Sequence, residues 1–502
     1  MVYREFWPFL EMTYQEAIHF LYDLRLFGLK LGLENTFKLA ALAGNPHEKL
    51  RFIHVAGTNG KGSTCAMLES IYRAARLRVG LFTSPHLVSF RERIQVNRQL
   101  ISEADVVRLV GEIRRPGRPV ALPALQPGIT TGGTACENLK PAERSCDFTR
   151  VSTPPSMSAK TSDGSGRRDA CPTFFEFVTV MALRYFADQQ CDLVIWETGM
   201  GGRLDATNIV TPLASVITNV ELDHQQWLGD TRAQIAAEKA GIIKPGVPVI
   251  TATDAPEALE VIETTAKKLN APLFKMGQAS IRSWSGKRPD LPLLGGHQRL
   301  NAALAVKTVE VLREKIPVSE ASIQRGLETV QWPGRMQLVN TVSGQLVLLD
   351  GAHNASSAEA LCEVLRSGKV RRLISRRRHR TKDRAIRQDA GGTLILGVLA
   401  DKDWAPMCAT LAPLAKRILL APVSSERTAA PGALHEACVK ANPTADTLTC
   451  PSLADALKHA ADDPFVIITG SLYLVGEAME LLKLLPATVG SERGLNEWTL
   501  KK

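Results

Sequence analysis

Hydrophobic and polar positions along the first two thirds of the chain follow two alternating patterns. Short, continuous apolar runs are typical of strands that are buried on both faces of a sheet. Residues 64–75 instead repeat their apolar positions at helical spacing. Strands that alternate with helices predict a parallel sheet covered on both faces. The expected strands are residues 52–56, 193–196, 215–218 and 247–251.

The same pattern begins again after Trp332, Pro333 and Gly334. A Pro-Gly pair is a common turn between structural units. Because 502 residues exceed what a single core usually organises, we expect two domains, residues 1–331 and 332–502. The second should be a smaller, Rossmann-like α/β domain. Its expected elements are a helix at 356–365 and strands at 346–349, 394–398, 418–421 and 465–469.

Two segments interrupt the pattern. Residues 114–172 are rich in Pro, Gly, Ser and Thr, and they cannot bury enough apolar surface to offset the entropy of ordering. We expect a largely disordered insertion there. Residues 367–392 carry ten Lys or Arg against two Asp and contribute +8 of the net charge of +10. We expect a solvated basic loop; contact with an anion or nucleic acid is the alternative, which the lack of interleaved aromatic residues disfavours.

Overall composition points to an ordinary globular protein, with 45% hydrophobic and 22% charged residues. No apolar run is long enough to span a bilayer, so we expect no membrane association. The first residues lack the pattern of a signal peptide. Nine cysteines without a CxxC pair indicate neither a disulfide framework nor a zinc site. Together these features predict a reducing, cytoplasmic environment.

A glycine-rich loop at residues 57–64 lies between a predicted strand and a predicted helix. Backbone N–H groups beside glycines can approach phosphate oxygens, the helix N-terminus adds a favourable dipole, and Lys61 would reach the outer phosphates. The alternative is a glycine turn with an exposed lysine, because Val55 and Gly62 break the strict phosphate-loop pattern. The strand–loop–helix setting favours an α/β fold whose first domain is a P-loop ATPase with a mostly parallel sheet. The nucleotide contacts expected are Gly57, Thr58, Asn59, Gly60, Lys61, Gly62, Ser63 and Thr64.

Three further polar residues belong to the same predicted sheet or to its helices. Glu197 directly follows the strand at 193–196, so its carboxylate should lie at the edge where ligands bind. Such a hard oxygen suits a magnesium ion that bridges phosphates, although a helix cap or surface charge is the alternative. His224 follows the strand at 215–218 and is a further candidate ligand, although a lone histidine is more often structural. Lys239, on a predicted helix, is by default a solvated side chain.

These motifs occur in the order found in a known family. Further stretches extend the match: SPHLVSFRERI at 84–94, GGRLDATN at 201–208, PGR at 333–335, DGAHN at 350–354 and LADKD at 399–403. The chain resembles folylpolyglutamate synthase and its bifunctional relative dihydrofolate synthase, of the Mur ligase superfamily. The likeness covers nearly the whole chain apart from the two insertions.

The resemblance implies roles for particular residues. It implies that Ser84, Glu197 and His224 bind magnesium, with two ions expected. It implies that Lys239 is carbamylated, which converts a cation into a carboxylate-like group that positions the second ion. The nucleotide contacts that it adds are Asn301, Arg335 and Asp350. The pterin pocket that it implies consists of Thr173, Phe174, Phe175, Leu204, Asp205 and Ala206.

The implied reaction is ATP-dependent ligation of L-glutamate to the carboxylate of dihydropteroate or of a tetrahydrofolate. An acyl phosphate would form and give an amide, ADP and phosphate, while Lys61, Arg335 and the magnesium ions neutralise the transferring phosphoryl group. We expect a monomer that closes its two domains around ATP. The rivals are a Mur-type ligase for a muramyl peptide and a regulatory nucleotide-binding protein whose basic loop contacts nucleic acid. The SPHLVSFRERI stretch disfavours the first, and the full set of expected metal ligands disfavours the second.

Overall fold

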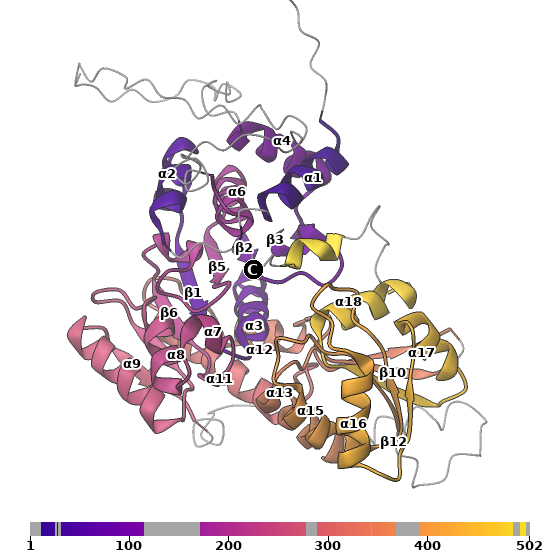
Figure 1. Cartoon of the computed structure of the whole chain (residues 1–502). Coiled ribbons are helices and arrows are strands. Elements are labelled where there is room, and N and C mark those ends of the chain that lie inside the picture. The colour runs from indigo at the N-terminus through magenta and orange to yellow at the C-terminus, as the bar shows by residue number, and fades with distance from the viewer. Residues whose placement is uncertain are drawn as a thin grey trace, which may run out of the picture.

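The computed structural model describes residues 12–25, 28, 32–114, 171–277, 289–342, 344–367, 392–484 and 492–497. The expected insertion at 114–172 and the expected basic loop at 367–392 lie outside the described residues, apart from their ends. The described chain forms two α/β units, each with a central sheet between helices (Figure 1). The division between them at residues 331 and 332 remains a proposal.

The first sheet has eight strands in the order β4-β3-β2-β5-β1-β6-β7-β8. Neighbours from β2 to β8 run parallel, whereas β3 is antiparallel to both β2 and β4. The predicted parallel sheet is therefore confirmed. The strands are β1 Phe52–Ala56, β2 Val79–Phe82, β3 Ile94–Val96, β4 Gln99–Leu100, β5 Leu193–Glu197, β6 Ala214–Ile217, β7 Val249–Thr251 and β8 Leu273–Lys275.

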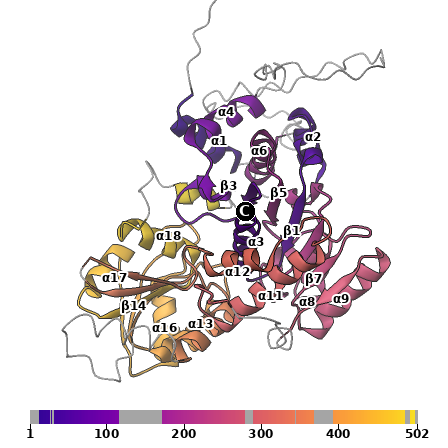
Figure 2. The same ribbon diagram turned by 180° about the vertical axis from the view of Figure 1, so that it is seen from behind.

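Side chains of the central strands alternate between two cores, one on each face of the sheet. Phe52 of β1 faces one core, while Ile53 and Val55 face the other. Figures 1 and 2, seen from opposite sides, show helices over both faces. The first core includes helices α1 Tyr14–Leu24, α2 Glu34–Leu42, α4 Glu103–Arg114 and α6 Phe174–Asp188. The second core includes helices α3 Lys61–Ala74, α11 Gly296–Val311 and α12 Glu320–Glu328. A smaller third core includes helices α8 Arg232–Ala240 and α9 Pro256–Lys268.

Helix α3 begins at Lys61, earlier than the start predicted at residue 64. Gly60 takes a left-handed conformation with φ of 83°, so the chain turns from the loop directly into the helix. The first turn of α3 consists of polar or small residues, so the spacing of apolar residues in the sequence does not reveal it. The remaining short helices are α7 Gln225–Leu228, η2 Pro46–Lys49, η3 Phe90–Arg93, η4 Ala206–Ile209, η5 Ala412–Leu414 and η6 Glu492–Asn496.

The second sheet has six strands in the order β13-β12-β11-β14-β10-β9, all parallel except the pair β9 and β10. Predicted strands 346–349 and 465–469 have the observed bounds. One face packs on α13 Ala355–Arg366, α15 Trp404–Leu411 and α16 Pro431–Ala441, and the other on α17 Leu453–His459 and α18 Leu472–Leu481. The strands are β9 Gln337–Asn340, β10 Leu346–Leu349, β11 Gly392–Leu396, β12 Ala415–Leu420, β13 Asp446–Thr449 and β14 Phe465–Thr469.

The last described segment, residues 492–497, contacts both units, since Glu497 pairs with Arg427 and Arg493 with Glu480 of the second unit. Its helix η6 contacts α1 and η3, and Figure 1 shows this yellow segment beside β3. The two units are thus joined at two places in the sequence, near residue 332 and near the end of the chain. Among the helices that the structure describes, none is long and apolar enough to cross a membrane.

Candidate active site

A cavity of about 400 Å³ lies between the two units. It opens at the edge of the first sheet where the parallel strands β1, β5 and β6 end, which is the usual ligand-binding edge of such sheets. Of the site residues expected from the sequence, all but Thr64, Leu204 and Ala206 line this cavity. The structure therefore gathers residues from distant parts of the chain, while their individual roles remain predictions.

The loop between β1 and α3 is shaped by two glycines whose conformations other residues rarely adopt. Gly57 has φ of 152°, and a Cβ there would lie 1.8 Å from Oγ1 of Thr218. Gly60 has φ of 83°, and a Cβ there would lie 2.6 Å from Oδ1 of Asn301. A larger residue would therefore clash with Thr218 just after β6 at the first position, and with Asn301 on α11 at the second.

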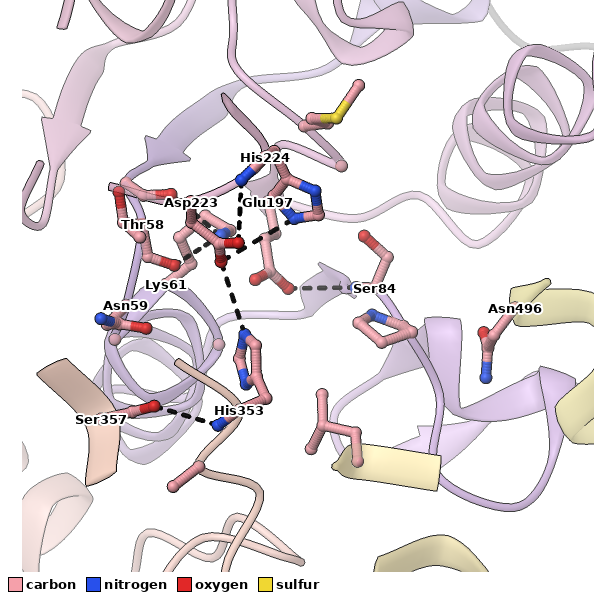
Figure 3. A pocket seen from close by; sticks show the side chains of 18 of the residues that line it. Thr58, Asn59, Lys61, Ser84, Glu197, Asp223, His224, His353, Ser357 and Asn496 are labelled. Atoms are coloured by element: carbon pink, nitrogen blue, oxygen red, sulfur yellow. Dashed lines mark hydrogen bonds and ion pairs between the residues drawn. The ribbon is translucent and has the colours of Figure 1, made fainter. Parts of the chain in front are cut away.

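Lys61 folds back over this loop. Its Nζ donates to the carbonyl oxygens of Gly57 at 2.9 Å and of Thr58 at 3.1 Å, as Figure 3 shows in part. Burial lowers the pKa of Lys61, and the negative charges of Glu197 and Asp223 oppose that change. The ammonium group is thus held at the mouth of the loop, where the outer phosphates of a nucleotide would lie.

Glu197, at the end of β5, is 3% exposed. Its Oε2 accepts a hydrogen bond from the backbone N–H of Ser84 at 3.1 Å (Figure 3). Burial raises the pKa of Glu197 to about 7, against the lowering influence of Lys61. A second cation beside the carboxylate would lower this pKa and favour the charged form.

His224 and Asp223 follow β6. His224 has φ of 53°, which turns the backbone sharply, and its N–H donates to Oδ1 of Asp223 at 2.9 Å. Burial lowers the pKa of the His224 imidazole to about 3, so the ring is neutral near pH 7. A neutral imidazole is the form that binds a metal ion.

Asp223 itself connects the two units. Its carboxylate receives Nζ of Lys402 at 2.6 Å and Nδ2 of Asn354 at 3.3 Å, and Nε2 of His353 lies 3.7 Å away. Burial alone would raise the pKa of Asp223, but Lys402 and the histidines hold it well below its usual range. The three partners come from the DGAHN and LADKD stretches. These two stretches are the only part of the sequence that indicates this contact, and no role for the contact was predicted from the sequence.

Lys239, on α8, is 3% exposed. The default expectation of a solvated side chain is therefore wrong. Burial lowers the pKa of Lys239 to about 7, and the nearby charge of Lys61 lowers it further. A substantial fraction of this amine is neutral near pH 7, which is the nucleophilic form.

The expected nucleotide contacts from later in the chain also lie at the cavity. Asn301 on α11 donates to Oε1 of Gln298 at 3.1 Å, and Gln298 in turn donates to Oγ of Ser63 at 3.3 Å. Asp350 accepts from the backbone N–H groups of Met336 and Ala352. Arg335, next to Met336, lines the same wall.

The expected pterin residues divide into two groups. Thr173 caps α6 through a reciprocal pair of hydrogen bonds with Glu176, so it has a local structural role as well as a place on the cavity wall. Phe174, Phe175 and Asp205 line the cavity, and Asp205 accepts from the N–H of Met200 at 2.8 Å. The neighbours of Asp205 in the sequence, at 204 and 206, are not among the residues that line the cavity.

Comparison with known proteins decides what kind of protein carries this site. Residues 334–472 match the family model described as Mur ligase, glutamate ligase domain. The chain is 33% identical to the dihydrofolate synthase/folylpolyglutamate synthase of Bacillus subtilis, over 94% of this chain and 99% of that protein. The chain belongs to the dihydrofolate synthase/folylpolyglutamate synthase family. The folylpolyglutamate synthase of Lacticaseibacillus casei is 31% identical over the same share of this chain.

Solved structures of the family have the same fold. E. coli FolC in complex with DHPP and ADP aligns with a TM-score of 0.72 and 29% identity, over 95% of this chain and 99% of that one. Folylpolyglutamate synthase of Mycobacterium tuberculosis, complexed with ADP and AMPPCP, aligns with a TM-score of 0.72 and 26% identity, over 94% of this chain and 100% of that one. The resemblance drawn from the motifs and the mixed α/β fold class are both confirmed.

Proposed function

We propose that the protein is an ATP-dependent ligase that joins L-glutamate to the carboxylate of dihydropteroate or of a tetrahydrofolate. One observation carries the proposal: a single cavity between the two units brings the 57–63 loop together with Glu197, His224 and Lys239. Relatives named as folylpolyglutamate and dihydrofolate synthases, and FolC bound to DHPP and ADP, support both the nucleotide and the folate-type substrate.

Ser84 and Glu197 offer magnesium the oxygen ligands that it prefers, and His224 would add a nitrogen ligand. They offer a hydroxyl, a buried carboxylate whose pKa is raised, and a neutral imidazole at one cavity. Within the described residues no three His, Cys, Asp or Glu side chains gather as a metal site, so these three residues would hold the ion as a mixed set of ligands. When bound, magnesium would neutralise charge on the transferring phosphoryl group.

The chain's own residues would then perform the positioning. The loop amides and Lys61 hold the phosphates of ATP, and Arg335 adds positive charge from the second unit. The substrate carboxylate attacks the γ-phosphate and displaces ADP, which gives an acyl phosphate. The amine of glutamate attacks the acyl carbon, and phosphate leaves as the amide bond forms. Closure of the second unit excludes water, which would otherwise hydrolyse the acyl phosphate.

Carbamylation of Lys239 is part of this proposal. Its neutral amine adds to carbon dioxide, a C–N bond forms, and one proton is released. The product is an anion where a cation would otherwise stand beside Lys61. Burial of Lys239 and its pKa of about 7 both favour that reaction near neutral pH.

Rates of ADP release test the proposed function, measured with dihydropteroate and with a tetrahydrofolate, each with and without L-glutamate. We expect release that needs both substrates and a product one glutamyl residue heavier. The variant Lys61→Ala should be slower by about a hundredfold or more. Turnover with a muramyl peptide in place of both folates would contradict the assignment. A monomeric state and a cytoplasmic location remain part of the proposal.

A further inference from the structure

Arg93 is a buried cation on the cavity wall to which the reaction above assigns no role. It ends η3, within the SPHLVSFRERI stretch, and is 3% exposed. Its Nε donates to Nδ1 of His86 at 2.9 Å, and its Nη2 donates to Oδ1 of Asn496. Among the described residues it forms no ion pair with a carboxylate. The negative charges of Glu92 and Glu197 act on Arg93 only from beyond ion-pair distance. Because a buried charge is costly without an opposite partner in contact, an anion bound in the cavity would supply the direct partner that this arrangement lacks.

Both partners of Arg93 are neutral acceptors. Nε2 of His86 donates to the carbonyl oxygen of Glu492 at 2.9 Å, which leaves Nδ1 without a proton and able to accept from Arg93. Burial lowers the pKa of Arg93 to about 10, so the guanidinium stays positive near neutral pH.

The C-terminal segment, residues 492–497, fixes this geometry. Asn496 accepts from Arg93 and donates through Nδ2 to the carbonyl oxygen of His86 at 3.0 Å. Its own carbonyl oxygen accepts from Oη of Tyr473 at 2.6 Å. The Glu492 carboxylate accepts from the N–H of Phe90 at 2.6 Å, which joins the segment to η3. Figure 3 shows Asn496 on the side of the Ser84 loop away from Lys61.

The position of Arg93 indicates which anion it meets. Its Cζ lies 5.4 Å from the ring centroid of Phe174, where the pterin is expected, and it lines the same cavity as Glu197, where the phosphates are expected. A folate-type substrate that extends from the first site to the second would carry its carboxylate past Arg93. We propose that Arg93, oriented by Asn496 and His86, binds the substrate carboxylate that receives glutamate. This inference rests on the proposed function and names one further contact for it.

Binding of pteroate and of its neutral carboxamide, measured by calorimetry without ATP, tests the proposal. The wild type should prefer the carboxylate by about tenfold or more, since a hydrogen bond to a charged group contributes that much. Asn496→Asp would place a negative charge against Arg93 at almost the same side-chain volume. We expect this variant to lose most of the preference and to bind the carboxamide as the wild type does.

Arg93→Met should also lose the preference, and the control Arg91→Met, on the same short helix but outside the cavity, should keep it. ADP affinity, expected to be unchanged in all variants, shows whether each one is folded. If Arg93→Met does not bind ADP and is therefore not folded, the carboxylate preference of Asn496→Asp alone tests the proposal. A wild type that binds neither compound would refute the proposed function. A wild type that prefers the carboxylate, with Asn496→Asp retaining that preference, would refute the role of Arg93 alone.

Discussion

Burial changes the chemistry of individual side chains in this protein. Lys239 is an ordinary lysine in the sequence, yet the fold excludes it from water and lowers its pKa to about 7. His54 on β1 is fully buried, and burial lowers its pKa to about 3. In both cases the cause is the cost of a charge in a medium of low polarity. Neither change could be read from neighbours in the sequence.

Lys239→Ala should reduce ligation by about a hundredfold, because the variant cannot form the proposed carbamate. Added acetate or bicarbonate should restore part of the rate, since a free carboxylate can occupy the vacated volume. The exposed Lys267→Ala, on α9, is the matched control and should neither lose activity nor respond to acetate. Full activity in Lys239→Ala would remove carbamylation from the mechanism.

His54 should make stability depend on pH. The unfolded chain takes up a proton on this side chain below about pH 6.5, whereas the folded protein does so only near pH 3. Stability should therefore fall as the pH drops below 6.5, by about 1.4 kcal/mol per pH unit from this group. Urea midpoints at pH 7 and pH 5 measure the effect.

The variant His54→Gln isolates that contribution, because other groups titrate equally in both proteins. We expect its midpoint to fall less between pH 7 and pH 5 than that of the wild type, with exposed His459→Gln behaving as the wild type. If the urea midpoint falls equally in the wild type, in His54→Gln and in His459→Gln, His54 is protonated in the folded state too.

At the scale of elements, the apolar runs predicted the central strands best. Strands β1, β5, β10 and β14 are buried along their whole length, and their sequences are mainly apolar, although His54 stands within β1 and Glu197 ends β5. Strands β8, β9 and β13 lie at the edges of the two sheets, are only partly buried, and were not predicted. An edge strand packs on fewer neighbours, so its residues carry a weaker apolar pattern.

Close approach of α12 to α3 depends on Gly326. A Cβ at this position would lie 2.4 Å from Cα of Ile71, which is backbone and cannot swing aside. Gly326→Ala should therefore destabilise the protein by about 1–3 kcal/mol. Gly111, on α4, has open space, and Gly111→Ala should stabilise by about 0.5–1 kcal/mol because it lowers the flexibility of the unfolded chain. Urea unfolding measures both, and equal effects of the two substitutions would contradict the packing argument.

The whole molecule is organised around contacts between its two units. Lys402 and Asp223 form an ion pair of 2.6 Å across the cavity, with side chains only 10% and 7% exposed. The C-terminal segment adds a second connection, because Arg427 pairs with Glu497 while Arg25 donates to the carbonyl oxygen of Glu497. Such contacts hold the two units in the arrangement in which residues of both line the cavity.

Lys402→Met should shift the equilibrium away from this arrangement, because it leaves the buried Asp223 without its nearest cation. We expect ligation to fall by about tenfold or more and the radius of gyration to rise in small-angle X-ray scattering with ADP present. Lys416→Met, at an exposed position on β12, is the control and should change neither quantity. An unchanged radius together with lost ligation would instead assign Lys402 a direct role in binding substrate.

The sequence by itself determined the alternation of strands and helices, the glycine-rich loop between β1 and α3, and the family, because these depend on residues that are close together in the chain. Only the tertiary structure decided that Lys239 is buried, that Asp223 meets Lys402, and that Asn496 reaches Arg93. Each of these joins residues far apart in the sequence or depends on burial. Pairings of that kind follow from the packing of elements against one another, which apolar periods and motifs do not encode.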